Sequence, residues 1–139
     1  MQGKRLQDMQ VGDTASFTKT ISESDVYGFA GITGDFNPVH IDAVYAEQSM
    51  FKHRIAHGML YAGFISTVLG TQLPGPGTIY LSQSLRFLKP VYIGDTITAE
   101  VEVTELLEEK NRVRLSTRCR NQDAVIVAEG ESVLIPRTD

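Results

Sequence analysis

The run 59–69 contains almost no polar residue, and it constrains the fold more than any other stretch of the chain. A helix that is apolar all round is normally buried, and a segment of this length is too short to cross a bilayer. Gly70 follows directly and predicts the end of the helix. The sequence therefore predicts one central helix that the rest of the chain has to enclose.

Most of the remaining chain alternates apolar and polar residues, which is typical of half-buried strands. The predicted strands cover residues 14–21, 78–88, 96–107, 112–121 and 124–135. Within the last of them, Gly130 predicts a bulge where the inward side of the strand changes. Together these elements predict an α+β fold, with an antiparallel sheet of about five strands wrapped around the buried helix in one domain over residues 1–139.

The overall composition argues against two classes of binding partner, nucleic acids and membranes. The chain has 139 residues, of which 42% are hydrophobic and 22% charged, as in a globular protein with its own core. Its net charge of −4 is not that of a nucleic-acid-binding or membrane-binding protein, so we expect neither partner. The single Cys119 excludes an internal disulfide and a Cys-rich metal site, and no targeting segment is visible, so we expect a cytoplasmic location.

A second predicted helix precedes an unusual loop. Ser22 has the character of an N-cap, followed by acidic residues in the first turn, and the helix is predicted to end at Gly31. It presents Val26, Phe29 and Ala30 to the core. It then delivers the chain into the loop.

That loop brings a carboxylate and an imidazole close together in sequence. Asp35 precedes His40, and Gly34, Asn37 and Pro38 around them are turn formers. A tight turn can aim both side chains at one small volume, which suits general acid–base chemistry on a water molecule. The alternative is an Asx turn at Asp35 and a histidine that only packs or caps the next helix. The two residue types alone leave both interpretations open.

The segment 34–40 reads Gly-Asp-Phe-Asn-Pro-Val-His, and it resembles the hydratase-2 motif of the MaoC-like (R)-specific enoyl-CoA hydratases. Residues 55–60 are similar to the segment that opens the central helix of that family, and residues 73–87 are similar to the loop and strand that follow. The three blocks occur in the order of the family and cover nearly the whole chain. The resemblance implies a hot-dog fold, a homodimer with two sheets paired edge to edge, an acyl-CoA thioester substrate and no separate cofactor.

The resemblance also implies roles for individual residues. Asp35 is the main base and returns the proton to the α-carbon, His40 orients and polarises the water, and the amide of Gly58 donates to the thioester oxygen. The activity implied is that of a hydro-lyase, which interconverts trans-2-enoyl-CoA and (R)-3-hydroxyacyl-CoA by syn addition. The start of the predicted helix independently favours Gly58, because its first N–H groups are unpaired. The alternative is a glycine that is required only for a sharp turn into the helix. No cluster of histidine, cysteine and carboxylate residues has metal-ligand spacing, so no metal site is predicted.

Three further residues are weaker candidates. Ser66 lies two helical turns after Gly58, where it either contacts substrate or bonds back to the carbonyl of Ala62. Asn37 either contacts substrate or braces the loop. His57 is predicted to be a packed, hydrogen-bonded histidine rather than a second acid.

The acyl tail is expected to run from Gly58 along the central helix. Leu69 would then line its end as a substrate-binding residue, together with Val68 and with Val133 or Leu134 of the last strand. These side chains predict a short tunnel and a preference for acyl chains of about four to six carbons, each buried methylene contributing about 0.8 kcal/mol.

Several alternatives share this fold. A 3-hydroxyacyl-ACP dehydratase would use the same residues on an acyl-carrier-protein thioester. A thioesterase needs water aimed at the carbonyl carbon, for which the 34–40 loop is not typical. A non-catalytic acyl-CoA-binding domain would have no use for Asp35 and His40 together. The arginines between 112 and 120 are predicted to form a solvated strand face, although one of them could meet a CoA phosphate.

Overall fold

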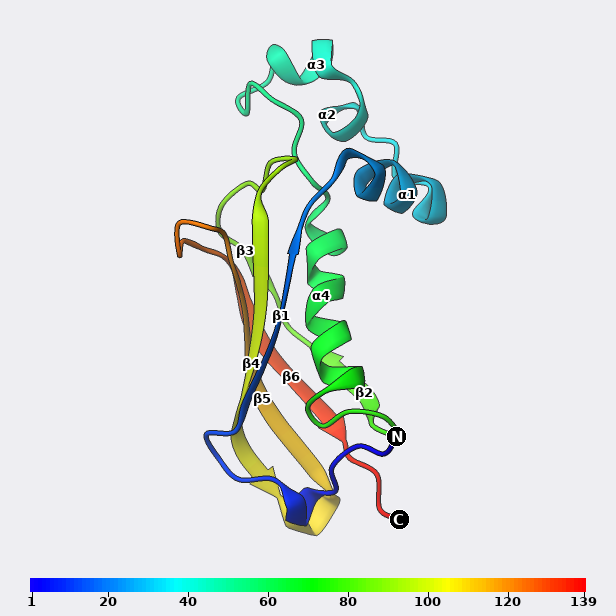
Figure 1. Cartoon of the computed structure of the whole chain (residues 1–139), viewed down its shortest axis with the longest axis vertical. Coiled ribbons are helices and arrows are strands. Elements are labelled where there is room, and N and C mark those ends of the chain that lie inside the picture. Colours follow the sequence, from blue (N-terminus) through cyan, green and yellow to red (C-terminus); the bar gives the residue numbers. More distant parts are fainter.

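The structure is a computed structural model that describes residues 1–139, and it shows a long curved sheet alongside one central helix (Figure 1). The central helix is α4 (Gly58–Thr71). Three shorter helices lie beyond one end of the sheet: α1 (Glu23–Thr33), α2 (Pro38–Ile41) and α3 (Ala43–Glu47). Both chain termini lie at the opposite end (Figure 1). The predicted α+β architecture is confirmed.

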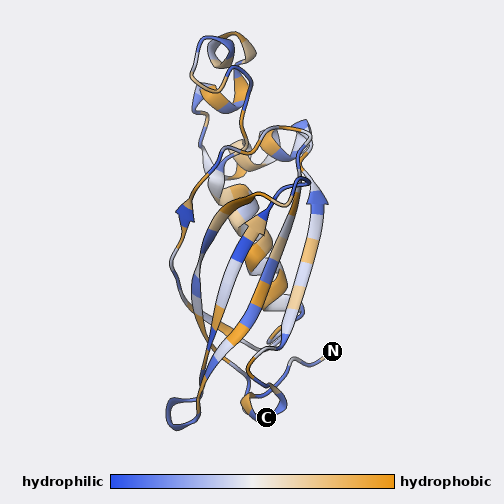
Figure 2. Ribbon diagram, turned by 90° about the vertical axis from the view of Figure 1, so that its left-hand side faces the viewer, coloured by the Kyte–Doolittle hydropathy of each residue, from blue (hydrophilic) through white to orange (hydrophobic).

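The sheet is entirely antiparallel. Its strands are β1 (Thr14–Thr20), β2 (Ile79–Gln83), β3 (Arg86–Phe87), β4 (Thr96–Leu107), β5 (Arg112–Arg120) and β6 (Ile126–Ile135). They are ordered β1-β4-β5-β6-β2, and β3 also pairs with β6. Short 3-10 helices precede β1 (Leu6–Asp8) and join β4 to β5 (Glu108–Lys110). Hydrophobic and hydrophilic residues alternate along the strands (Figure 2), so one face of the sheet can turn toward α4.

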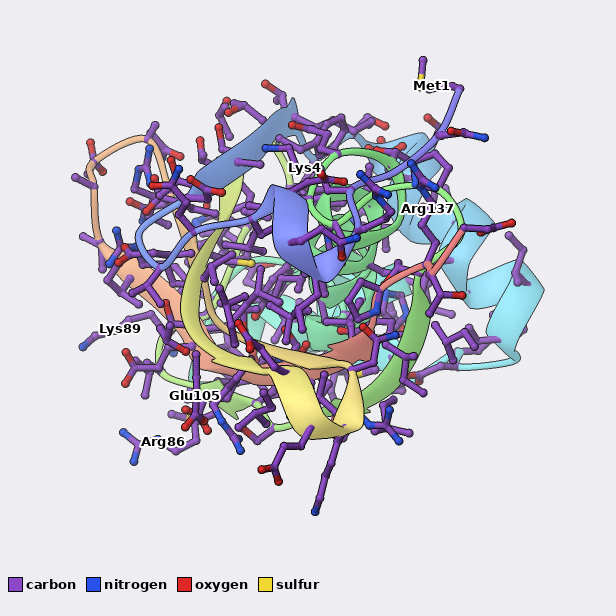
Figure 3. The ribbon with its side chains drawn as sticks, turned by 90° about the horizontal axis from the view of Figure 1, so that it is seen from below. Met1, Lys4, Arg86, Lys89, Glu105 and Arg137 are labelled. Carbon is purple, nitrogen blue, oxygen red and sulfur yellow. The ribbon has the colours of Figure 1, made fainter.

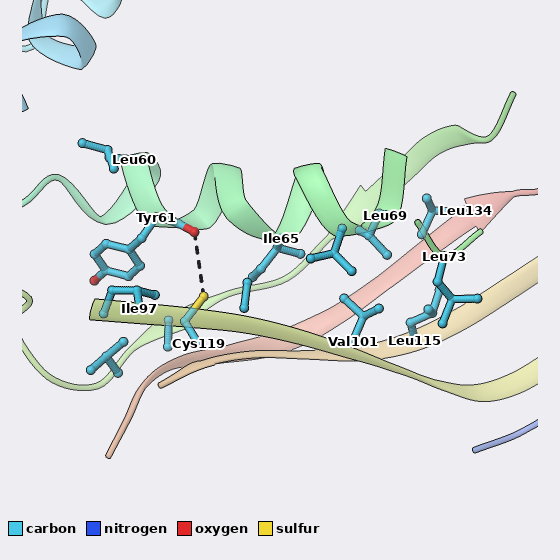
Figure 4. Close-up of a cluster of buried hydrophobic side chains, with 14 of the residues drawn as sticks. Leu60, Tyr61, Ile65, Leu69, Leu73, Ile97, Val101, Leu115, Cys119 and Leu134 are labelled. Carbon is cyan, nitrogen blue, oxygen red and sulfur yellow. Dashed lines mark hydrogen bonds between the residues drawn. The ribbon is translucent and has the colours of Figure 1, made fainter. Parts of the chain in front are cut away.

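The core lies between α4 and the concave face of the sheet (Figure 4). Val101 and Leu115 of the sheet and Ile65 of α4 are fully buried there, and removal of such side chains from water stabilises the fold. Cys119 belongs to the same cluster, as its alternating position predicts, and burial raises the pKa of its thiol to about 12. No helix of the chain has the length and apolar character needed to cross a membrane.

Helix α1 continues one turn further than predicted. Its N-cap is Ser22, whose Oγ accepts a hydrogen bond from the Asp25 N–H at 3.1 Å. The helix does not end at Gly31 but at Gly34, which adopts a left-handed conformation with φ 83° and donates its N–H to the Ala30 carbonyl. Glycine adopts this conformation without steric cost, and the cap that stops the helix needs it at position 34.

Helix α4 begins at Gly58 and runs to Thr71, so it does not end at Gly70 as predicted. It is also not buried all round. Met59, Gly63, Ser66 and Gly70 form an exposed stripe at a spacing of three and four residues. The physical reason is that a single sheet curls around only part of the helix surface.

The predicted strand 78–88 is interrupted, and the prediction for Gly130 is wrong. Residues 84 and 85 interrupt the strand between β2 and β3. The Ser84 N–H still donates to the Glu131 carbonyl at 2.9 Å, and the Ser84 carbonyl lies directly over Gly130. A Cβ atom at position 130 would lie 1.8 Å from the Ser84 carbonyl oxygen, so close approach of two backbones, not a bulge, requires the glycine. The register of β6 shifts elsewhere, opposite Cys119 and Arg120.

Candidate active site

The loop between α1 and α2 is held by its own polar side chains. The Asp35 N–H donates to Thr33 Oγ1 at 3.2 Å, and the Asn37 N–H donates to Asp35 Oδ1 at 3.2 Å. Asn37 Oδ1 in turn accepts from the Val39 N–H at 3.3 Å and caps α2. The Asx turn at Asp35 therefore exists. It engages only one carboxylate oxygen, and Oδ2 accepts no hydrogen bond from the chain, so the turn and an acid–base role are compatible.

His40 lies on α2, and its tautomer follows from its partner. The ring is 7% exposed, and Nδ1 lies 2.7 Å from the Ile55 carbonyl oxygen. A carbonyl oxygen only accepts, so Nδ1 donates its hydrogen and Nε2 keeps a free lone pair. Burial lowers the pKa of His40, and nearby His57 lowers it too, whereas the Ile55 carbonyl and the Asp35 charge act in the opposite direction. His40 is therefore neutral at pH 7 and can accept a proton or a hydrogen bond through Nε2.

His57 contacts both Asp35 and His40. It directly precedes α4, is 2% exposed, and places Nε2 3.0 Å from the backbone oxygen of Asp35. Its ring stacks on His40 with centroids 3.8 Å apart, and it also contacts Phe29. Because Nε2–H donates to Asp35, Nδ1 keeps its lone pair, and this buried atom has no hydrogen-bond partner. The prediction of a packed, hydrogen-bonded histidine is confirmed, and its partners include both candidate catalytic residues.

The three residues form a compact cluster. One nitrogen or carboxylate oxygen from each of Asp35, His40 and His57 lies within 4.8 Å of the others. The sequence shows no such grouping at metal-ligand spacing, because the three side chains meet only in the folded chain. His57 is 22 residues from Asp35, so only the tertiary structure brings it to the loop.

Gly58 provides a hydrogen-bond donor beside this cluster. It is the first residue of α4, a helix of 14 residues whose N-terminus has no side-chain cap. Its N–H group lies at the positive end of the helix dipole and has no acceptor within the helix. The structure adds a second reason for glycine, since a Cβ atom would lie 2.6 Å from the ring of Phe87.

A pocket of about 510 Å³ opens next to these groups. His40 and Gly58 both line it, and most of the remaining wall is apolar, including Met50, Phe51 and Phe87. Lys89 is the one charged side chain in the wall. A largely apolar pocket with a few convergent polar groups is typical of a small-molecule site.

Two of the three weaker candidates, Ser66 and Leu69, lie further along α4, whereas Asn37 belongs to the loop itself. Ser66 is exposed on α4 and makes no bond to the Ala62 carbonyl, although Thr67 and Thr71 bond back in this way. Leu69 is 1% exposed, packs in the core and does not line the 510 Å³ pocket. Contacts of Ser66, Asn37 and Leu69 with substrate stay predictions.

Known proteins resemble this chain over nearly its full length. An (R)-specific enoyl-CoA hydratase of Rhodospirillum rubrum is 54% identical over 131 residues, which are 94% of this chain and 91% of the relative. A 3-hydroxybutyryl-CoA dehydratase of Methylorubrum extorquens is 48% identical over 96% of this chain and 85% of the relative. The solved structure of the unliganded R-hydratase PhaJ1 of Pseudomonas aeruginosa superposes with a TM-score of 0.94 at 48% identity, covering 99% of this chain and 88% of that one.

These similarities confirm the expected hot-dog architecture. Residues 8–125 match the MaoC like domain, a segment that includes all of the loop, helix and pocket residues described above. The chain belongs to the MaoC-like domain family, within its (R)-specific enoyl-CoA hydratases.

Proposed function

We propose that the chain hydrates trans-2-enoyl-CoA reversibly to (R)-3-hydroxyacyl-CoA through a water molecule held by Asp35 and His40. The hydratase activity follows from the relatives, which carry it at 54% identity. One structural observation supports the residue roles. One carboxylate oxygen of Asp35 and one ring nitrogen of His40 lie within 4.8 Å of each other, beside the unpaired N-terminus of a helix.

That spacing suits a single bridging water. A water that bonds to two acceptors at about 2.8 Å each can link atoms up to roughly 5.5 Å apart. The free Oδ2 of Asp35 removes a proton as the water oxygen attacks the β-carbon, and neutral His40 holds the water through Nε2. The proton from Asp35 then goes to the α-carbon. Hydroxyl and proton come from one water on one face, so the addition is syn.

The same step places negative charge on the thioester oxygen. The Gly58 N–H, at the positive end of α4, is the proposed donor to that oxygen. The donor is part of the backbone and is fixed before substrate arrives, so no reorganisation is needed as the charge develops. No covalent intermediate is needed in this scheme.

His57 positions both members of the pair in this proposal. Its Nε2–H bond holds the main chain of Asp35, and its ring face supports His40. It is a positioning residue, since its own free nitrogen is buried away from hydrogen-bonding partners.

One assay separates the proposed activity from its alternatives. Crotonyl-CoA is the first substrate to use, because a relative at 48% identity is named for the four-carbon thioester. A hydratase lowers the enoyl-thioester absorbance without release of free thiol, and a coupled dehydrogenase specific for one enantiomer reports the (R) product. Thiol release would indicate a thioesterase, and binding without turnover would indicate a non-catalytic domain. Parallel turnover of the acyl-carrier-protein thioester tests the dehydratase alternative.

We also infer that two copies associate. The edge strand β2 exposes Ile79 and Leu81, which are 58% and 51% accessible in the single chain, and Phe87 of β3 is 49% accessible. Open apolar edges favour pairing with another chain, and the exposed stripe of α4 provides a second uncovered surface. A homodimer with paired sheet edges would cover β2.

A further inference from the structure

We propose that Lys89 recognises the phosphate groups of the CoA carrier at the mouth of the pocket that holds His40 and Gly58. This inference rests on the proposed hydratase function and names the part of the site that holds the non-reacting end of the substrate. A CoA thioester carries several negative charges on its phosphates, whereas this protein has a net charge of −4. Binding therefore needs a local cation within reach of the phosphate end of the pantetheine arm.

Most cations of the chain are already paired. Of the 13 lysine and arginine residues, seven form ion pairs with carboxylates: Arg5, Lys19, Arg54, Arg86, Arg114, Arg118 and Arg120. The arginine face of β5 belongs to this group, because Arg114 pairs with Glu105 at 3.1 Å, and Arg118 pairs with Glu100. The solvated face predicted for these arginines is thus an ion-pair ladder on the sheet. It leaves little free charge for a phosphate.

Four of the six remaining cations lie at the wrong end of the molecule. Lys4 and Arg137 are near the chain termini, where the Lys4 N–H donates to Pro74 and Arg137 bonds to the Gly3 carbonyl (Figure 3). Lys110 and Arg112 flank the β4–β5 turn, which Figure 1 shows at the end opposite α1 to α3. The phosphates are joined by the pantetheine arm to a thioester at Gly58, so we expect them to bind at the end of the molecule that carries Gly58.

Lys52 and Lys89 are left at the end that carries the site. Lys52 has no carboxylate partner, but it lines a different cavity of about 690 Å³, which His40 and Gly58 do not line. Lys89 has no carboxylate partner, is exposed, and lines the same pocket as His40 and Gly58. Figure 3 shows its side chain projecting outward from the body of the molecule.

The rest of the pocket suits the arm that joins the thioester to the phosphates. Phe87, Leu88 and Pro90 surround Lys89 in the sequence, and all three line the pocket with it. An apolar wall with one cation at its rim matches a ligand that has a flexible uncharged arm and an anionic end. Lys89 is thus placed to hold the anion while the thioester lies at Gly58.

The test compares two thioesters, one with and one without the phosphorylated nucleotide of CoA. Crotonyl-CoA and crotonyl-pantetheine share the reacting group and the arm, and the second lacks the phosphorylated nucleotide. For Lys89→Met we expect kcat/KM for crotonyl-CoA to fall roughly five- to tenfold, mostly through KM, because the lost contact is made equally in ground and transition states. The rate with crotonyl-pantetheine should stay within twofold of wild type. Lys89→Arg should restore most of the loss, and higher ionic strength should shrink the difference between wild type and Lys89→Met.

A matched control is Lys110→Met, which removes one positive charge at the far end and should leave both substrates unaffected. Equal loss on both thioesters with Lys89→Met, or no loss on crotonyl-CoA, would overturn the proposal. Failure of the proposed function looks different, because wild-type protein would then hydrate neither thioester.

Discussion

At the scale of single residues, the chemistry depends on three side chains that the fold brings into one cluster. Asp35 and His40 are the proposed base and water-orienting group, and His57 contacts both. Each has a distinct hydrogen-bond partner, so each of their roles can be tested by a separate change.

Asp35→Asn retains the shape of the side chain and removes the base, and His40→Gln retains a hydrogen-bonding group and removes the titratable ring. Each substitution should lower kcat for crotonyl-CoA by roughly a hundredfold or more, the usual scale for a positioned acid or base. Circular dichroism and thermal melts verify that the variants fold. Near wild-type turnover in both folded variants would mean that the proposed mechanism is wrong.

The pKa of His40 predicts the acidic side of the pH profile. Burial lowers this pKa from its ordinary value of 6.5, so the active neutral ring persists below pH 6.5 and the acid limb of kcat/KM should lie below that value. The same shift favours the neutral ring in the folded state. Its contribution to stability is therefore complete above pH 6.5 and is lost as the pH falls through the folded pKa. An acid limb at or above pH 6.5 would contradict this assignment. Because the Asp35 charge raises the His40 pKa, Asp35→Asn should lower that pKa further, and an NMR titration in which it did not fall would also contradict it.

The cluster of Asp35, His40 and His57 could bind a metal ion, so the effect of metals on the rate tests whether the reaction uses one. The proposed reaction needs no metal, so EDTA should leave the rate unchanged. Added Zn²⁺ should inhibit, because a carboxylate and imidazole nitrogens within 4.8 Å can bind it where the water belongs, and EDTA should restore the rate. Loss of activity after EDTA treatment that one metal restores would show that the metal takes part in catalysis.

At the scale of elements, the two faces of α4 lie in different environments. One side, including Ile65 and Leu69, packs on the sheet, and the other exposes Met59, Gly63 and Ser66. Its N-terminus supplies the proposed oxyanion donor. A single helix therefore connects the core, the site and the exposed surface.

The chain-length prediction tests the packed side of α4. Leu69→Ala should cost about 2–5 kcal/mol of stability, since it leaves a cavity in the core. If the acyl tail runs along α4, the same cavity should raise kcat/KM for an eight-carbon enoyl-CoA relative to crotonyl-CoA. Leu115→Ala, equally buried on β5, is the control and should lose stability without a change in that ratio. An unchanged ratio in folded Leu69→Ala would mean that the tail lies elsewhere, for example along the exposed stripe.

At the scale of the whole molecule, the sheet ends in an apolar edge that one chain does not cover. We expect a dimer by light scattering after size-exclusion chromatography. Leu81→Asp should yield folded monomer, because the side chain is exposed in the single chain and the new charge opposes only association. Val11→Asp, at an exposed position away from β2, should remain dimeric. A monomeric wild type, or a dimeric Leu81→Asp, would contradict the proposed interface.

The local features of this protein could be predicted from residue order alone. Alternation defined four of the strands to within one or two residues, apolar character defined α4, and Ser22 marked the start of α1. The 34–40 motif carried the resemblance that identified Asp35 and His40. Such features depend on neighbours along the chain, so they are visible in residue order.

How distant segments meet could not be predicted from residue order, because it depends on the packing of the folded chain. His57 reaches Asp35 and His40 because α4 starts beside the loop, Gly130 is required because Ser84 crosses it, and Phe87 closes over Gly58. The exposed stripe of α4 likewise reflects how far one sheet can wrap around a helix. These contacts join residues separated by tens of positions, and their geometry is set by packing of the core, which no local pattern of side chains specifies.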